Sequence, residues 1–107
     1  MTATVPVIGL TAGTVRLFAD PLRLAIIELL AREELCTCHL VEATGAKQPT
    51  VSHHLRALRE AGIVEPEAVG AYTYYRLRPD ALRALADGFA ALADRAGQPT
   101  RRKRPCD

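Results

Sequence analysis

The sequence has no tryptophan and only two phenylalanines and three tyrosines among its 107 residues. Hydrophobic residues still make up 49% of the chain, so its core must be mainly aliphatic and is expected to be rich in helix. No run of eighteen apolar residues is present, so no membrane span is expected. The segment Met1–Leu10 lacks the basic start and the long apolar run of a secretory signal. We therefore expect a cytoplasmic protein.

The chain also lacks a strong excess of charge, except near its C-terminus. Residues 1–100 carry ten basic and eleven acidic side chains, a net charge of −1. The segment Arg101–Arg104 is entirely basic and is followed by one acid, Asp107. Between Lys47 and Arg78 the local excess is +2, a modest potential that is compatible with nucleic acid. We expect one domain over residues 1–97, which binds DNA and dimerises, and a basic, flexible tail over residues 98–107.

Cysteine is scarce: the chain contains Cys36, Cys38 and Cys106. Disulfides are not expected in a reducing compartment, and a bond between residues two apart would be strained. A Cys-x-Cys pair is more typical of a thiolate site for a soft metal or for redox chemistry. Cys106, carried by the tail, is a candidate third ligand.

Hydrophobic spacing and capping residues predict helices over four early ranges: 11–19, 20–32, 38–44 and 49–61. Asp20-Pro21 is typical of a helix start, and Gly45 and Gly62 stand where helices end. Glu33–Leu35 is expected to form a turn. The third and fourth helices, joined by a short glycine-containing turn, are typical of a helix-turn-helix.

Two runs rich in β-branched and aromatic residues, 63–69 and 72–77, flank Gly70-Ala71 and predict a β-hairpin. Pro66 favours an edge position for the first run, and the register stays open. Pro79-Asp80 begins a last helix with one apolar stripe. The fold class expected is therefore mainly α with a small β-hairpin, a winged helix-turn-helix.

The fourth helix carries a polar face opposite Val51, Leu55 and Leu58, while His54 lies nearer the core side. Gln, Ser and His side chains can hydrogen-bond base edges in the major groove, and Arg can contact guanine or phosphate. A solvated polar face is the alternative. The residues expected to contact DNA are Lys47, Gln48, Thr50, Ser52, His53, Arg56 and Arg59.

Three stretches carry a resemblance to a known family: residues 34–38 (ELCTC), 47–64 (KQPTVSHHLRALREAGIV) and 74–77 (YYRL). Together they resemble the ArsR/SmtB family of metal-sensing repressors over roughly residues 12–95. The resemblance implies a homodimeric repressor that leaves its operator DNA when metal binds. It places the base contacts at Gln48, Thr50, Ser52 and His53, whereas Lys47 departs from the hydroxyl residue often found there. It also implies a dimer interface on the first and last helices, at Val15, Phe18, Leu82, Leu85 and Phe89.

The Leu-Cys-x-Cys motif resembles the site of arsenic-responsive members, in which three sulfurs bind As(III) or Sb(III), and it implies a role in arsenical resistance. The third cysteine of that pattern would fall at Val41, so either Cys106, solvent or an added thiol must complete the site. The cadmium- and lead-responsive type uses further cysteines near the N-terminus, and the zinc type uses histidine on the last helix; this sequence has neither. We expect no constitutive cofactor and As(III) or Sb(III) as inducer, with Cd(II), Pb(II) or Zn(II) as alternatives.

Residues two apart on a regular helix point in different directions. Capture of one ion by Cys36 and Cys38 is therefore expected to unwind the first turn after Leu35, which would move the support of the DNA-reading helix. His39, next to Cys38, could ligate Zn(II) or Cd(II), but it is expected to face solvent or to form a hydrogen bond. An enzyme is not expected, since the chain has no βαβ pattern, glycine-rich phosphate loop or paired base. A repressor that senses oxidation through its thiols remains an alternative.

Overall fold

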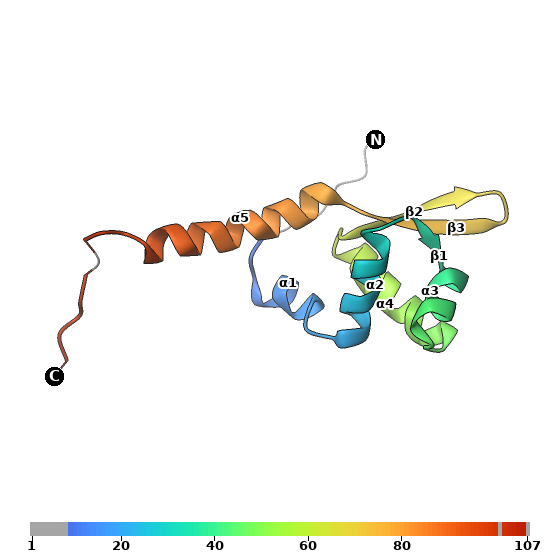
Figure 1. The fold of residues 1–107 in the computed structure, drawn as a ribbon, viewed down its shortest axis with the longest axis horizontal. Helices are drawn as coiled ribbons and strands as arrows, with labels where there is room; N and C mark the ends of the chain where they lie inside the picture. Colours follow the sequence, from blue (N-terminus) through green and yellow to red (C-terminus); the bar gives the residue numbers. More distant parts are fainter. Residues whose placement is uncertain (1–8, 101, 107) are drawn as a thin grey trace.

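The computed structural model of the chain describes residues 9–100 and 102–106. Parts of the predicted domain and tail lie outside that description, namely residues 1–8, Arg101 and Asp107. The elements follow one another as α1 (Ala12–Leu17), α2 (Pro21–Leu30), β1 (Leu35–Cys36), α3 (Thr37–Thr44), α4 (Gln48–Glu60), β2 (Val64–Val69), β3 (Tyr72–Leu77) and α5 (Pro79–Ala96) (Figure 1). This order confirms the predicted fold class, a mainly helical winged helix-turn-helix.

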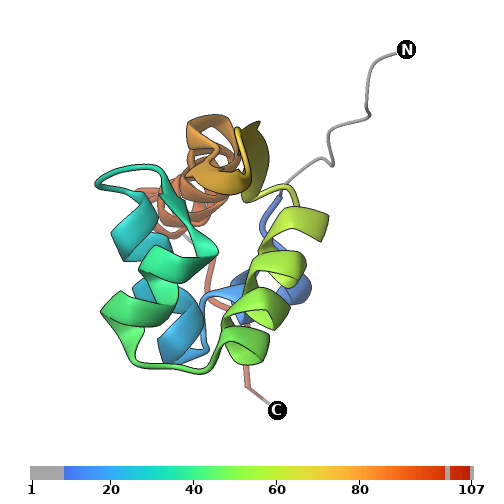
Figure 2. The same cartoon turned by 90° about the vertical axis from the view of Figure 1, so that its right-hand side faces the viewer.

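The helix ends follow the local chemistry of the sequence. Asp20 caps α2, because its side-chain oxygen accepts a hydrogen bond from the Arg23 amide at 3.0 Å. Gly45 ends α3 at φ 73°, a left-handed conformation that favours glycine, so the chain can turn sharply into α4. Figure 2 shows this short connection between α3 and α4.

The sheet has three antiparallel strands in the order β1-β3-β2. The predicted turn at Glu33–Leu35 is displaced, because the chain turns at Ala31 and Arg32 and Leu35 already lies in β1. Leu35 and Cys36 pair with Tyr75 and Tyr74 of β3. The hairpin register, left open by the sequence, pairs Val64 with Leu77 and Val69 with Tyr72. Pro66 lies on the outer strand β2, which confirms its predicted edge position.

We call residues 20–77 the body and residues 79–106 the C-terminal arm. The body holds most of the core, because Ile26, Leu40, Val51, Leu58 and Ile63 are completely buried. The arm contributes Ala81 and Leu85 to this core, and α5 then projects away from the body (Figure 1). None of the described helices is both long enough and apolar enough to span a membrane.

Candidate metal site and DNA-reading surface

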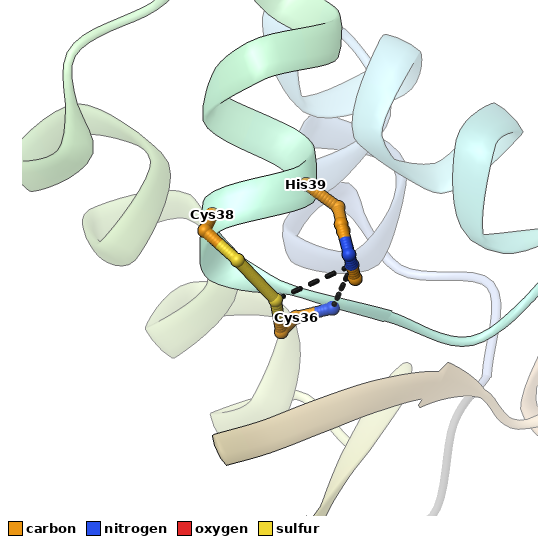
Figure 3. A group of neighbouring side chains, drawn as sticks. All are labelled: Cys36, Cys38 and His39. Atoms are coloured by element: carbon orange, nitrogen blue, oxygen red, sulfur yellow. Dashed lines mark hydrogen bonds between the residues drawn. A yellow bond between two sulfur atoms is a disulfide. The ribbon is translucent and has the colours of Figure 1, made fainter. Parts of the chain in front are cut away.

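Cys36 and Cys38 lie side by side at the start of α3. Cys36 is the residue before the helix, in an extended conformation with φ −87° and ψ 170°, and Cys38 lies in the first helical turn. Because the extended residue turns its side chain toward that first turn, the two sulfurs and His39 Nδ1 all lie within 4.8 Å of one another (Figure 3). Within the described residues these three side chains are the cluster that could hold a metal ion.

This geometry corrects the expected unwinding of α3. The expectation placed both cysteines on a regular helix, but Cys36 precedes the helix and the sulfurs already meet while α3 is intact from Thr37. Capture of one ion by the pair therefore does not require the first turn to open.

The structure joins Cys36 and Cys38 by a disulfide, so the expectation of an unbonded pair is also wrong for this state. The two Cα atoms are 5.5 Å apart, inside the range of about 4.4–6.8 Å that disulfides use. The oxidised form binds no metal, since the ligand is the thiolate. The same pair must be reduced before it can act as a metal site.

His39 holds the first cysteine in place. Its Nδ1 accepts a hydrogen bond from the backbone amide of Cys36 at 3.1 Å and lies 3.3 Å from the Cys36 sulfur. Of the two roles predicted for His39, facing solvent or forming a hydrogen bond, the structure shows the hydrogen bond. Since Nδ1 is used as an acceptor, it is a less available metal ligand than a free imidazole nitrogen.

The two cysteines differ in their access to solvent. Cys36 is 4% exposed, whereas Cys38 is exposed and lines a cleft of about 320 Å³. Val41, which stands where a third cysteine would complete the arsenic pattern, lines the same cleft, as does Gln48, the first residue of α4. The open side of the thiol pair thus borders the start of α4, the helix that the sequence predicts to read DNA.

Cys106 does not join the cluster within one chain. It is exposed, and the described residues after α5 form neither helix nor strand. This segment leaves the far end of α5, opposite to the end that meets β3 and the body (Figure 1).

The predicted DNA contacts lie together on α4 and its cap. Ser52 is half-buried, and the other six are exposed: Lys47, Gln48, Thr50, His53, Arg56 and Arg59. The opposite face of α4 is buried through Val51, Leu55 and Leu58. The polar face of α4 is therefore exposed, and β2 and β3 form the hairpin of the winged helix-turn-helix.

His54 lies on the buried side of α4, as the spacing predicts, with 7% of its surface exposed. Arg23 Nε donates a hydrogen bond to His54 Nδ1 at 3.1 Å, and His54 Nε2 lies 3.8 Å from the Asp20 carboxylate. Burial lowers the pKa of His54, and the neighbouring Arg23 and His53 lower it further, while Asp20 acts in the opposite direction. This link between α4 and the start of α2 joins residues 31 positions apart, and no local pattern in the sequence predicts it.

An apolar groove of about 200 Å³ lies between α1 and α5. It is lined by the five residues predicted for the dimer interface: Val15, Phe18, Leu82, Leu85 and Phe89. Val15 and Phe89 are 44% and 54% exposed, so one chain leaves this surface uncovered.

The fold and this polar helix define the chain as a winged helix-turn-helix transcriptional regulator. Residues 20–66 match the model of the family described as "Bacterial regulatory protein, arsR family". The solution structure of a homodimeric winged helix-turn-helix domain from Mycobacterium bovis, a possible ArsR-family regulator, is 31% identical with a TM-score of 0.63. The match covers 87% of this chain and 86% of that one. The chain belongs to the ArsR family, whose members regulate transcription and are not enzymes.

Two further relatives carry different names, and one of the names refers to arsenic. The arsenic resistance transcriptional regulator ArsR1 of Pseudomonas putida is 48% identical over 63 residues, which cover 58% of this chain and 49% of that protein. The transcriptional repressor SmtB homolog of Synechocystis is 46% identical over 59 residues, which cover 55% of this chain and 45% of that protein. The chain thus spans about half the length of these two relatives.

Proposed function

We propose that the chain is a homodimeric repressor that binds operator DNA through α4 and releases it when Cys36 and Cys38 capture As(III) or Sb(III). The observation that carries this proposal is the position of the thiol pair beside Gln48. The reduced pair offers two sulfur donors to one ion, and soft thiolates favour soft ions. The arsenic resistance regulator among the relatives supports the same inducer.

DNA recognition is assigned to the exposed face of α4. Gln48, Thr50, Ser52 and His53 would contact bases, and Lys47, Arg56 and Arg59 would contact phosphates or guanine. The basic segment 101–104 would add phosphate contacts outside the groove. A dimer presents two such helices, which matches the symmetry of a palindromic operator.

Dimerisation is assigned to the groove between α1 and α5. A second copy of the chain is the occupant that fits, because the groove is apolar and Leu92, three residues after Phe89 on the same helix, is a further apolar side chain that is 44% exposed. The homodimeric state of the Mycobacterium bovis relative supports this assignment.

Release of DNA would follow from what enters the cleft next to Cys38. A metalloid and its third ligand would add bulk on the wall that Gln48 shares. If a ligand fits in this cleft only after Gln48 has left the DNA, binding of that ligand lowers the affinity for the operator. Binding of the operator then lowers the affinity for the ligand by the same factor.

A second candidate function is a repressor that senses oxidation, and the disulfide between Cys36 and Cys38 favours it. Two thiols would lose two electrons and two protons to a peroxide, which is reduced to water or to an alcohol and water. The bond would then form without any metal.

A third candidate function is a repressor of the same family that responds to Cd(II), Pb(II) or Zn(II), and the position of His39 supports it. Its imidazole nitrogen lies beside the sulfurs, and mixed sulfur and nitrogen sets suit zinc-like ions. The ion would first have to displace the Cys36 amide from Nδ1.

A gel-shift titration on operator DNA tests these functions together. Wild type, Cys36→Ser/Cys38→Ser and Cys106→Ser are each titrated with arsenite, Cd(II), Zn(II) and peroxide under controlled thiol conditions. We expect arsenite to release wild type and to leave the double variant bound. Normal release of the double variant by arsenite refutes the proposal, and release of wild type by peroxide alone favours the redox function.

A further inference from the structure

Among the described residues, His54 is the one polar or charged residue that is buried, and it lies on α4, the helix proposed to read DNA. We propose that His54, held by Arg23 and Asp20, is a positioning residue that fixes the orientation of α4 relative to the groove between α1 and α5. This inference rests on the proposed function and adds what aligns the reading helix within the dimer.

The first step is the chemistry of the link. A guanidinium only donates hydrogen bonds, so the 3.1 Å bond from Arg23 Nε makes His54 Nδ1 the acceptor and leaves the ring proton on Nε2. Nε2 lies 3.8 Å from the Asp20 carboxylate, which favours a proton on that nitrogen. Burial lowers the pKa of His54, so the neutral ring that accepts from Arg23 is the main form at neutral pH. The start of α2 thus holds the ring at both of its nitrogens.

The second step is the place of this link in the fold. Within the part of the chain that the structure describes, it is the only side-chain hydrogen bond between two different helices. Asp20 caps α2 and closely follows Val15 and Phe18, which line the groove between α1 and α5. At its other end the link holds α4 next to His53, whose ring centroid is 5.3 Å from that of His54. A predicted base contact is therefore tied to the segment that borders the groove.

The third step is what orientation does for recognition. A dimer reads both halves of a palindromic operator only when its two reading helices match the spacing of the major grooves. Contacts to phosphates carry no sequence information, whereas hydrogen bonds to base edges require side chains in the correct geometry.

A small rotation of α4 about its axis would carry Ser52 and His53 away from the bases and still leave its arginines close to phosphates. The buried side chain of His54 opposes this rotation, because turning the helix would break the bond to Arg23. Loss of the link should therefore lower the affinity for operator DNA much more than the affinity for DNA of unrelated sequence.

A comparison of two DNA duplexes tests the inference. A duplex that wild type selects from a random library serves as the operator, and a scrambled duplex of the same length and composition serves as non-specific DNA. Fluorescence anisotropy measures both dissociation constants for wild type, His54→Leu, Arg23→Met, their double variant and His54→Asn. Thermal unfolding followed by circular dichroism sets a temperature at which the compared variants are folded. Arg83→Met, which removes the same charge from an exposed position on α5, is the control.

We expect His54→Leu and Arg23→Met each to lower the preference for operator over scrambled DNA by about tenfold or more. The double variant should lose no more than either single variant, because both substitutions remove the same link. His54→Asn, which keeps an acceptor for Arg23, should retain most of the preference, and the Arg83 control should retain all of it.

An unchanged preference in both single variants overturns the inference. Equal losses of affinity for the two duplexes overturn it too, because a role in folding alone would lower both affinities alike. A His54→Asn variant no better than His54→Leu also overturns it, since acceptance from Arg23 is then not what matters. If His54→Leu does not fold, Arg23→Met decides by the same criteria. If wild type selects no duplex at all, the proposed function has failed rather than the role of His54.

Discussion

The body and the C-terminal arm differ in how completely one chain covers their apolar residues. In the body, Ile26, Leu40 and Leu58 have no exposed surface. In the arm, Phe89 and Leu92 are 54% and 44% exposed. The body therefore holds a closed core, with Leu24, Val69 and Tyr72 exposed at its surface, whereas α5 has only Ala81 and Leu85 buried within one chain. The thiol pair lies in the body, and Cys106 lies in the arm.

A leucine-to-alanine substitution should change the free energy of unfolding much more in the body than in the arm. Leu55, in the body, is 2% exposed, so Leu55→Ala should lower the free energy of unfolding by about 2–5 kcal/mol through lost burial and the cavity that it leaves. Leu92→Ala removes the same atoms from the arm and should cost little in the monomer. Urea unfolding at several protein concentrations measures both.

The loss in the Leu92 variant should shrink on dilution, because dimer dissociation removes the contact that the residue makes. A loss that is large and independent of concentration would show that Leu92 belongs to a core within one chain.

A charged side chain in the groove between α1 and α5 should weaken dimerisation without unfolding the body. Phe89→Asp would bury a carboxylate against an apolar surface, so we expect the dimer dissociation constant to rise at least tenfold, about 1.4 kcal/mol. Operator affinity should fall with it. Sedimentation velocity measures the dimer, and Asp87→Ala, an exposed change on the same helix, is the control. Unchanged dimerisation of the Phe89 variant would refute the assigned interface.

Lowering the pH below about 6.5 should reduce the stability of the body through its histidine side chains. The arm should not respond in this way, since residues 79–106 contain no histidine. The pKa of buried His54 is lowered from 6.5, so the unfolded chain binds more protons just below that value. Stability from this group is complete above pH 6.5 and is lost as pH falls toward the lowered pKa, by at most about 1.4 kcal/mol per pH unit. The pKa of Asp20, also lowered, starts from 3.8, so Asp20 acts at more acid pH.

Unfolding free energies between pH 7.5 and 5 measure this loss. His54→Asn keeps an acceptor close to the position of Nδ1 for Arg23 and should flatten the profile, whereas His53→Asn should preserve it. A flat profile in wild type would show that His54 does not titrate in this range.

Helix periodicity and capping residues predict most of the secondary structure of the body. The features that they miss depend on contacts between residues far apart in the sequence. Asp20-Pro21 and Gly45 mark helix ends because capping acts within a few residues. The strand at Leu35 and Cys36 is too short to show alternation and forms only because β3 lies beside it. The contact between the two sulfurs depends on one extended residue before α3, and the link from Arg23 to His54 spans 31 positions. Neither leaves a local pattern.

The smallest effect is expected where the arm meets the segment before α1. A methyl group added at Gly88 would lie 2.6 Å from Leu10 Cβ, so Gly88→Ala must displace Leu10. The better helix propensity of alanine, about 1 kcal/mol, offsets part of a packing cost of about 1–3 kcal/mol. A net loss near 1 kcal/mol, reduced when Leu10→Ala is added, is expected by thermal unfolding. Identical losses in the single and double variants would show that the two residues do not interact.

The two edge strands of the small sheet are poorly suited to pairing with a strand of another molecule. Pro66 removes a backbone donor from the outer strand β2, and the strand on the other border is only two residues long. A neighbouring molecule therefore finds no continuous row of amide and carbonyl groups to extend. In the proposed dimer, association therefore falls to the helices, and the wing would stay unpaired and open to the proposed contact with a nucleic-acid backbone.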